Sequence, residues 1–260
     1  MTTAPAAEPL VELPALAGPL DSLWDLIVDI GSQLPPDGWV LVGGQMVMLH
    51  GLVAGRIATR ASQDVDVLAD LITDDAGLAR CVRVVRGLDL EPQRDSDGRV
   101  YRFVRAADNA RADLLAPDHM PPRRRLRTVG GDTIRIEGGT QALRRAMPVR
   151  VVKEDRSAVV PVPDLLGALV LKAAASAADS RDRERHSGDA AFLVSLMTDP
   201  LAERDRFAGS GCCGWIRCSA TRTPLSGAGL GMLPTTATPP GDCWSADRAA
   251  PSPASISGWV

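Results

Sequence analysis

Two aspartates, Asp64 and Asp66, have a spacing that suits metal-assisted chemistry. They lie in the segment ASQDVDVLAD, residues 61–70, where Val65 and Val67 alternate with acidic side chains, and this alternation predicts a β-strand. Residues two apart in a strand point to the same face, about 7 Å from each other. The two carboxylates are therefore candidates for a shared cation site, although D-x-D also occurs by chance on solvent-exposed strands.

A glycine turn precedes the acidic pair. Residues 39–42, WVLV, predict a short apolar strand, Gly43 and Gly44 a turn, and the segment after them a helix. Glycines at such a turn let backbone N–H groups approach a phosphate closely, and the start of a helix adds a favourable dipole. An ordinary strand-to-helix turn favours glycine too. The pattern is not a Walker phosphate loop, because its lysine and hydroxyl residue are missing.

A third carboxylate, Asp113, lies in the strand-like segment RADLL. Three acidic side chains from adjacent strands form the oxygen ligand set that Mg²⁺ prefers. Two such ions can hold an α-phosphate and activate an attacking hydroxyl group.

The elements expected to position these residues place an α/β half before a helical half. We expect an α+β fold, a mixed sheet flanked by helices and followed by a helical C-terminal region. The patterns predict helices at 21–34, 75–87, 140–147, 163–178 and 188–197, and strands at 39–42, 61–70, 99–105, 109–115, 134–136 and 149–152. The expected organisation is a flexible leader (1–20), a catalytic domain (21–152), a helical region (153–206) and a low-complexity tail (207–260).

The tail differs in composition from the rest of the chain. It holds Cys212, Cys213, Cys218 and Cys243 among Gly, Ser, Thr and Pro, without helical or strand periodicity. The cysteine spacing does not match a zinc site, and disulfides are not expected in a cytoplasmic protein. An out-of-frame translation of GC-rich DNA, which would cut the helical half short, or a disordered tail accounts better for this composition.

Composition excludes several function classes. Hydrophobic residues make up 45% of the chain, charged residues 23%, and the formal net charge is −3, which is typical of a soluble globular protein. No apolar run reaches the roughly 18–20 residues of a membrane span, and the start lacks the basic region of a secretory signal, so we expect a cytoplasmic protein with no membrane partner. The acidic balance argues against a general nucleic-acid binder, but an arginine cluster at 123–127 either contacts RNA or is simply solvated.

The motifs together resemble a known superfamily. LVGG (41–44), followed by Arg60, Ser62 and the DVDV run (64–67), is similar to the polymerase-β-like nucleotidyltransferases. The closest resemblance is to the AbiEii-type toxins of bacterial toxin–antitoxin systems. VPVPDLLGALVLKAAA (160–175) and RDRERHSGDAAFLVSLM (181–197) look like that family's helical element, which carries a lysine and a later aspartate, here Lys172 and Asp189. The resemblance covers about residues 38–200.

The resemblance implies both roles and partners. The implied catalytic and metal-binding residues are Asp64, Asp66 and Asp113, with Asp113 also receiving the proton of the acceptor hydroxyl; the implied nucleotide-binding residues are Gly43, Gly44, Ser62, Lys172 and Asp189. Two Mg²⁺ ions, with Mn²⁺ as an alternative, would assist transfer of a nucleoside monophosphate from an NTP to RNA, notably tRNA, and the protein would act as a toxin with a cognate antitoxin.

Other interpretations stay open. The acceptor can be a small molecule or a protein hydroxyl, or the chain is a catalytically impaired binding protein on the same fold. Lys172 can be a surface lysine that extends to solvent, and Asp189 a simple helix N-terminal charge.

Overall fold

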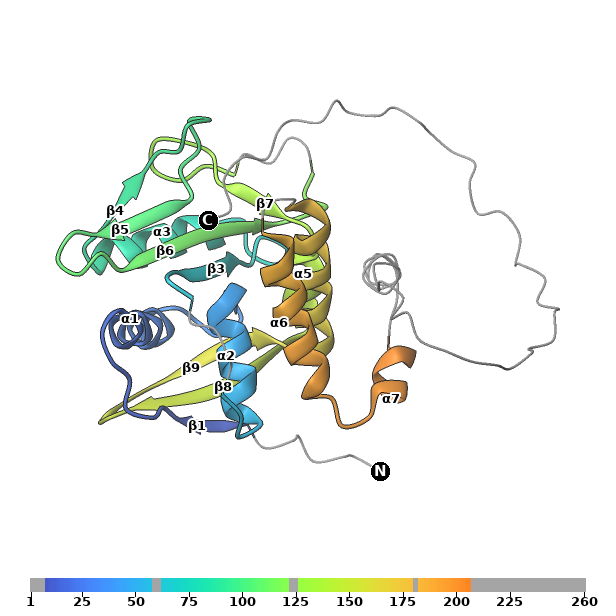
Figure 1. The fold of residues 1–260 in the computed structure, drawn as a ribbon. Coiled ribbons are helices and arrows are strands. Elements are labelled where there is room, and N and C mark those ends of the chain that lie inside the picture. The colour runs from blue at the N-terminus through green and yellow to red at the C-terminus, as the bar shows by residue number, and fades with distance from the viewer. Residues whose placement is uncertain (1–7, 58–61, 122–125, 180–181, 207–260) are drawn as a thin grey trace, which may run out of the picture.

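The computed structural model describes residues 8–57, 62–121, 126–179 and 182–206 (Figure 1). The strands are β1 (Leu10–Glu12), β2 (Trp39–Val42), β3 (Val65–Ala69), β4 (Leu90–Gln93), β5 (Arg102–Arg105), β6 (Arg111–Pro117), β7 (Ile134–Ile136), β8 (Ala146–Lys153) and β9 (Arg156–Pro163). The helices are α1 (Pro19–Gln33), α2 (Gly43–Val53), α3 (Gly77–Gly87), α4 (Gly139–Arg144), α5 (Leu165–Ala178), α6 (Arg183–Ser195) and α7 (Pro200–Asp205).

A six-stranded mixed sheet forms the larger layer. Its order is β2-β3-β6-β5-β4, with β7 also paired to β6. The β3–β6 and β6–β7 pairs are parallel, whereas β2–β3, β5–β6 and β4–β5 are antiparallel. The apolar residues of β2, β3 and β6 are buried, so this part of the sheet is covered on both faces. This architecture confirms the predicted α+β class.

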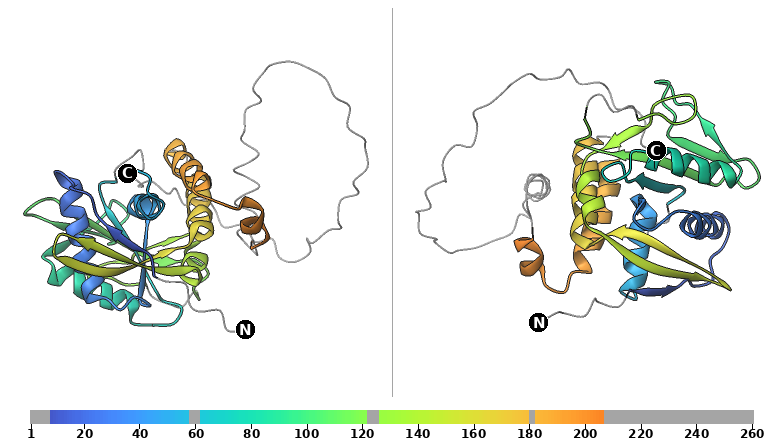
Figure 2. Two further views of the ribbon diagram at one scale, coloured as in Figure 1. Left: turned by 90° about the horizontal axis from the view of Figure 1, so that it is seen from below. Right: turned by 180° about the vertical axis from the view of Figure 1, so that it is seen from behind.

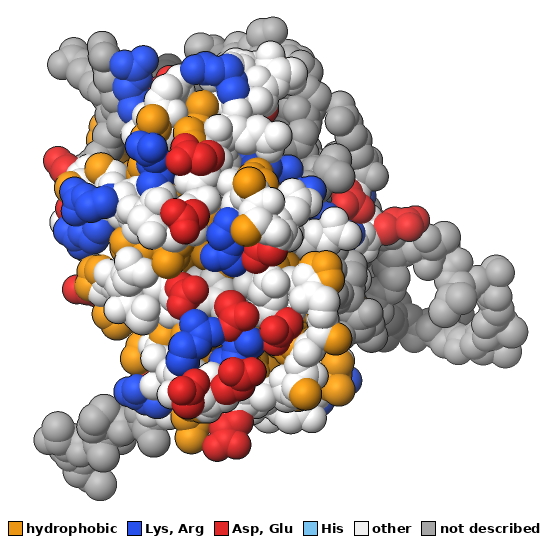
Figure 3. Space-filling view, turned by 90° about the vertical axis from the view of Figure 1, so that its left-hand side faces the viewer, with side chains coloured by type: hydrophobic (Ala, Val, Ile, Leu, Met, Phe, Trp, Pro, Cys, Tyr) orange, Lys and Arg blue, Asp and Glu red, His pale blue; other side chains and the backbone are white. Residues whose placement is uncertain are grey.

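A smaller sheet, β1-β8-β9, lies beside the first (Figure 1). In β9, Ala158, Val160 and Val162 are buried at alternate positions and contribute to one continuous core with the larger sheet. Helix α1 carries an apolar face that includes Ile27, and buries it in this core. On its polar side, α1 forms ion pairs with Lys153 and Arg156 of the β8–β9 hairpin. Figure 3 shows that acidic and basic side chains intermix on the face of the molecule where α1 lies.

The expected helices and strands are present, with some differences in extent. Part of the expected leader is structured, because residues 10–12 pair in parallel with β8. The expected helical region from 153 begins with strand β9, whose full pairing with β8 satisfies its backbone groups. Helix α6 begins at Arg183, earlier than the expected residue 188. The tail from 207 lies outside the described residues.

Helices α5 and α6 run side by side along one end of both sheets (Figures 1 and 2). Asp164 caps α5, because its side chain accepts a hydrogen bond from the Gly167 N–H. Within the described ranges, no helix is both long and apolar enough to cross a membrane.

Candidate active site

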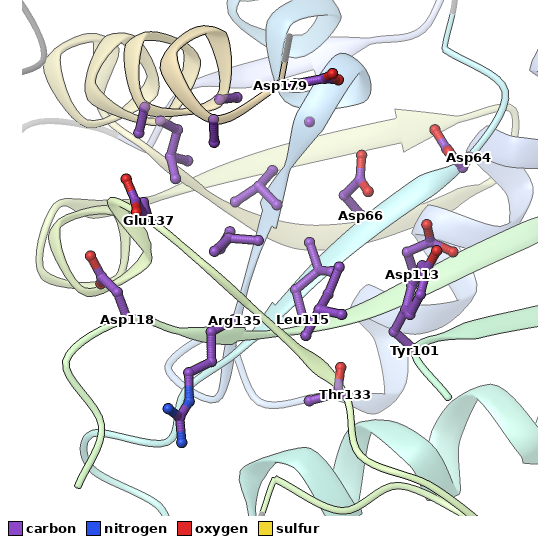
Figure 4. Close-up of a pocket in the computed structure, with 18 of the residues that line it drawn as sticks. Asp64, Asp66, Tyr101, Asp113, Leu115, Asp118, Thr133, Arg135, Glu137 and Asp179 are labelled. Carbon is purple, nitrogen blue, oxygen red and sulfur yellow. The ribbon is translucent and has the colours of Figure 1, made fainter. Parts of the chain in front are cut away.

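Asp66 and Asp113 face each other across the parallel pair β3–β6. They are direct register partners in this pair, so both side chains project from the same face of the sheet. Asp64 precedes β3 by one residue and receives a 2.8 Å hydrogen bond from the Ser62 hydroxyl. One carboxylate oxygen from each of the three aspartates lies within 4.8 Å of the other two. The three predicted acidic residues therefore form one cluster, the acidic triad, which is also visible in Figure 4.

Gly43 brings the chain into contact with this triad. It follows the last residue of β2 and begins α2, with a φ of 69° that side-chain-bearing residues rarely adopt. A Cβ atom at this position would lie 1.8 Å from Asp66 Oδ2. The first of the two predicted glycines is thus required for two reasons, its backbone conformation and the close approach of Asp66.

Arg102 balances part of the negative charge of the triad. Its Nε and Nη2 atoms donate to the two oxygens of Asp113 at 2.9 and 2.8 Å, and Nη2 lies 3.6 Å from Asp64 Oδ2. The geometry follows from the antiparallel β5–β6 pair, in which Arg102 stands opposite Asp113. No local sequence pattern marks Arg102 as part of the site.

Electrostatics makes the triad a site of unusual proton affinity. Burial, reinforced by the negative charges of Asp64 and Asp113, raises the pKa of Asp66 well above its ordinary value, whereas Lys172 and Arg185 oppose the rise. Burial also raises the pKa of Asp113, against the lowering effect of Arg102. Clustered carboxylates that are costly to leave charged are typical of functional sites, because a bound cation relieves the repulsion.

The triad opens into a cavity of about 750 Å³, a volume within the range of ligand-binding pockets. Gly43, Gly44, Ser62 and Lys172 line this cavity together with the triad. Figure 4 places Asp64, Asp66 and Asp113 on one side of the cavity, with Asp118 and Glu137 on the opposite side. Of the residues predicted for nucleotide and metal binding, Asp189 is the one that does not line it.

Lys172 and Asp189 join α5 to α6. Lys172 Nζ lies 2.8 Å from Asp189 Oδ2, and both side chains are buried. Lys172 is therefore not the surface lysine of the alternative interpretation. Because it lines the cavity while bound to Asp189, its charge is held at a defined place beside the triad.

Two further cavity residues, Arg185 and His186, come from α6. No local pattern marks these two residues, because their inward orientation depends on how α6 packs against α5. His50 of α2 is buried, and its ring contacts the Pro163 carbonyl oxygen at 2.8 Å. Arg60 of the motif and residues 123–125 of the arginine cluster lie outside the described residues.

Comparisons with known proteins add one similarity. No protein-family model matches the sequence, and no curated protein matches it. Among solved structures, the protein is similar to an antigenic nucleotidyltransferase-like protein from Paracoccidioides brasiliensis, with 12% identity and a TM-score of 0.49 over 78% of this chain and 89% of that chain.

Proposed function

We propose that the protein is a divalent-cation-dependent nucleotidyltransferase that moves a nucleoside monophosphate from an NTP to an acceptor hydroxyl group. One observation carries this proposal. The acidic triad lies beside a glycine turn at the start of a helix, in a cavity that also contains Lys172 and Arg185. This arrangement joins carboxylates for a hard cation to backbone and cationic groups for a phosphate chain.

The donor set fits Mg²⁺ or Mn²⁺. Asp64, Asp66 and Asp113 offer three oxygen ligands within 4.8 Å of one another, and oxygen is the ligand that both cations prefer. When bound, two such cations supply stabilisation of the negative charge that develops on the phosphate. The Ser62 hydroxyl, by bonding to Asp64, holds one ligand in place.

In the reaction, the acceptor oxygen bonds to the α-phosphorus while the bond to the bridging oxygen breaks and pyrophosphate leaves. The hydroxyl proton moves to an oxygen of Asp113, whose raised pKa suits a proton acceptor. Lys172 and Arg185 face the negative charge of the phosphate chain, and the Gly43–Gly44 backbone lets that chain approach. Asp189 acts through Lys172, as a positioning residue.

The acceptor and the biological role rest on the motif resemblance. We propose RNA, notably tRNA ends, as the acceptor, and a growth-arresting toxin controlled by a cognate antitoxin as the role. We also propose that the protein acts in the cytoplasm. The alternatives are transfer to a small molecule or to a protein, and a binding protein without transfer.

Incubation of the purified protein with Mg²⁺, each α-labelled NTP and total RNA tests the proposal. We expect label on RNA, and loss of that label by at least about 100-fold in Asp64→Asn, because removing a metal ligand removes the charge stabilisation of the transition state. Asp155→Asn, an exposed aspartate in the β8–β9 turn, is the matched control and should retain activity. Label on metabolite or protein alone would assign the alternative acceptor, and a folded protein that transfers nothing would refute the proposal.

A further inference from the structure

The cavity that holds the acidic triad has an apolar part, lined by seven side chains, beside polar residues such as Thr133 and Arg135. The walls of this apolar part come from α5, β7 and β6, and we name it the α5–β7 slot; the lining side chains are Leu171, Ala174, Ala175 and Ala178 from α5, Ile134 and Ile136 from β7, and Leu115 from β6. The four α5 residues have i, i+3, i+4, i+7 spacing and form a single stripe of the helix. Three of the four are alanines, so the helix presents a nearly flat surface to the cavity.

The sheet fixes how far the slot lies from the triad. Leu115 follows Asp113 by two residues in β6, so both project from the same face about 7 Å apart. Leu115 is in turn the register partner of Ile134 in β7. Gly138, just after β7, lies close to α5, since a Cβ there would lie 3.4 Å from Val170 Cγ1 and 3.5 Å from Leu171 Cδ2. The apolar walls thus begin about one strand repeat from Asp113 of the acidic triad.

A buried histidine of α6, His186, lies near the C-terminal end of α5. His186 is 4% exposed and lines the cavity, yet neither of its ring nitrogens makes a hydrogen bond to any described residue. Asp179 Oδ2 is its nearest acidic atom, at 3.7 Å from Nε2, beyond hydrogen-bond reach. A buried, unbonded imidazole is costly, and a ligand that bonds to it removes the cost.

We propose that the α5–β7 slot holds a nucleobase and that His186 hydrogen-bonds its polar edge. A nucleobase combines two apolar faces, which match the alanine surface and the isoleucines, with a rim of donors and acceptors. Burial, together with the positive charges of Lys172 and Arg185, lowers the pKa of His186 and favours its neutral form, which has one donor and one acceptor nitrogen. This inference rests on the proposed function and specifies the part of the cavity in which the nucleobase binds.

Binding measurements with and without a base test the slot. Calorimetry with Mg²⁺ compares inorganic tripolyphosphate with the α,β-methylene analogues of ATP, GTP, CTP and UTP, which cannot be cleaved at that bond. We expect the best nucleotide to bind at least about tenfold more tightly than tripolyphosphate, because burying a base face is worth that factor or more. The Ala175→Leu substitution fills the slot. In this variant the best nucleotide should bind only about twofold more tightly than tripolyphosphate, or less, while the affinity for tripolyphosphate is retained.

Matched variants separate the slot from general effects on α5. Ala177→Leu changes an exposed alanine of the same helix that does not line the cavity, and should keep the wild-type ratio. Ala178→Leu, exposed at the cavity, is a second slot variant should Ala175→Leu fold poorly. His186→Leu should reduce discrimination among the four nucleotides by about five- to tenfold, a readout that a structural role alone would not move.

The outcomes separate the two proposals. If tripolyphosphate and nucleotides bind equally, but Ala175→Leu raises the KM for an RNA acceptor, the slot holds the acceptor's base rather than that of the NTP. If tripolyphosphate and nucleotides bind equally and Ala175→Leu leaves the KM for the RNA acceptor unchanged, the slot does not hold a base. The proposed function would then still stand. If neither tripolyphosphate nor any nucleotide binds the folded wild-type protein, the proposed function fails and the slot with it.

Discussion

Gly43 leaves room for the Asp66 carboxylate, because it has no side chain of its own. Gly43→Ala would place a methyl group against Asp66 and strain a backbone with positive φ. We expect nucleotidyl transfer to fall by about 100-fold, because a displacement near 1 Å at a reacting centre has that cost. Gly55→Ala is the control, since Gly55 has φ +65° but open space around it. It should lose about 1 kcal/mol of stability and keep activity. Equal activity losses in both variants would contradict this role.

Arg102 stabilises a neighbouring side chain by its charge, since its guanidinium group pairs with the buried carboxylate of Asp113. Asp113 is 7% exposed in its side chain, so Arg102→Leu leaves a buried carboxylate without its partner. We expect a loss of about 3–5 kcal/mol in unfolding free energy, measured by urea denaturation, and partial recovery with Mn²⁺. The matched variant is Arg105→Leu in the same strand, whose partner Asp108 is more exposed, and it should lose about 1 kcal/mol or less. Equal losses of unfolding free energy in the two variants would show that the Arg102–Asp113 pair is no more stabilising than the Arg105–Asp108 pair.

At the residue scale, the three aspartates could be predicted because the pattern that marks them is local to each strand. The D-x-D alternation and the apolar cover of Asp113 located the triad, because strand periodicity fixes which side chains share a face. Arg102 was missed because nothing local marks it. Its importance comes from standing opposite Asp113, and register between β5 and β6 is not visible in either segment alone.

At the scale of elements, the Lys172–Asp189 pair joins two helices and lines the site. Removing one partner, as in Asp189→Leu, should destabilise the protein by about 3–5 kcal/mol, because Lys172 stays buried after losing its ion-pair partner. The double variant Lys172→Met/Asp189→Leu should regain most of that stability, measured by chemical denaturation. It should not regain nucleotidyl transfer if Lys172 contacts phosphate. A double variant with full activity would leave the pair a purely structural role.

Asp118 links the end of β6 to the start of α4. Burial alone would raise its pKa, but hydrogen bonds from the Thr140 and Gly138 N–H groups outweigh burial and place the pKa below its ordinary value. A lowered folded pKa stabilises the protein above the unfolded value, near 4, and this stabilisation is lost as pH falls through the folded value.

Asp118→Ala should therefore cost about 1–2 kcal/mol of unfolding free energy at pH 7. The gap between the variant and the wild-type protein should narrow as the pH falls below about 4, where Asp118 becomes protonated. Denaturation curves at a series of pH values measure this gap. A gap that stays constant over the whole series would show that the hydrogen bonds to α4 do not depend on the charge.

Helices and strands could be predicted where the sequence has strong periodicity or a capping residue. They could not be predicted where a strand forms only because it pairs with a distant strand. α1, α3 and α5 carry helical spacing or caps, and β2 and β3 carry apolar or alternating runs. β1 and β9 depend on β8 for their hydrogen bonds, so their formation is decided by distant residues. The position of α6 against α5, which brings Arg185 and His186 to the cavity, is likewise a tertiary property.

On the scale of the whole molecule, one continuous core joins the two sheets. Ile27 of α1 is fully buried in it, and Ile27→Ala should lower the unfolding free energy by about 2–5 kcal/mol. Because Trp24 in α1 and Trp39 in β2 belong to this core, fluorescence and far-ultraviolet circular dichroism should follow the same transition in wild type and variant. Two separated transitions would show that the sheets unfold independently.

The parallel pairing of β3 with β6 also bears on the order of folding. Asp66 and Asp113 come together only after the long intervening chain has closed, and until then each carboxylate is a solvated, separate charge. Their mutual repulsion opposes this closure, and the cation that relieves it has its full ligand set only in the assembled sheet. If the protein binds a cation as proposed, that cation stabilises the assembled native state. It prolongs the lifetime of the native state by slowing unfolding and does little to hasten the search that leads there.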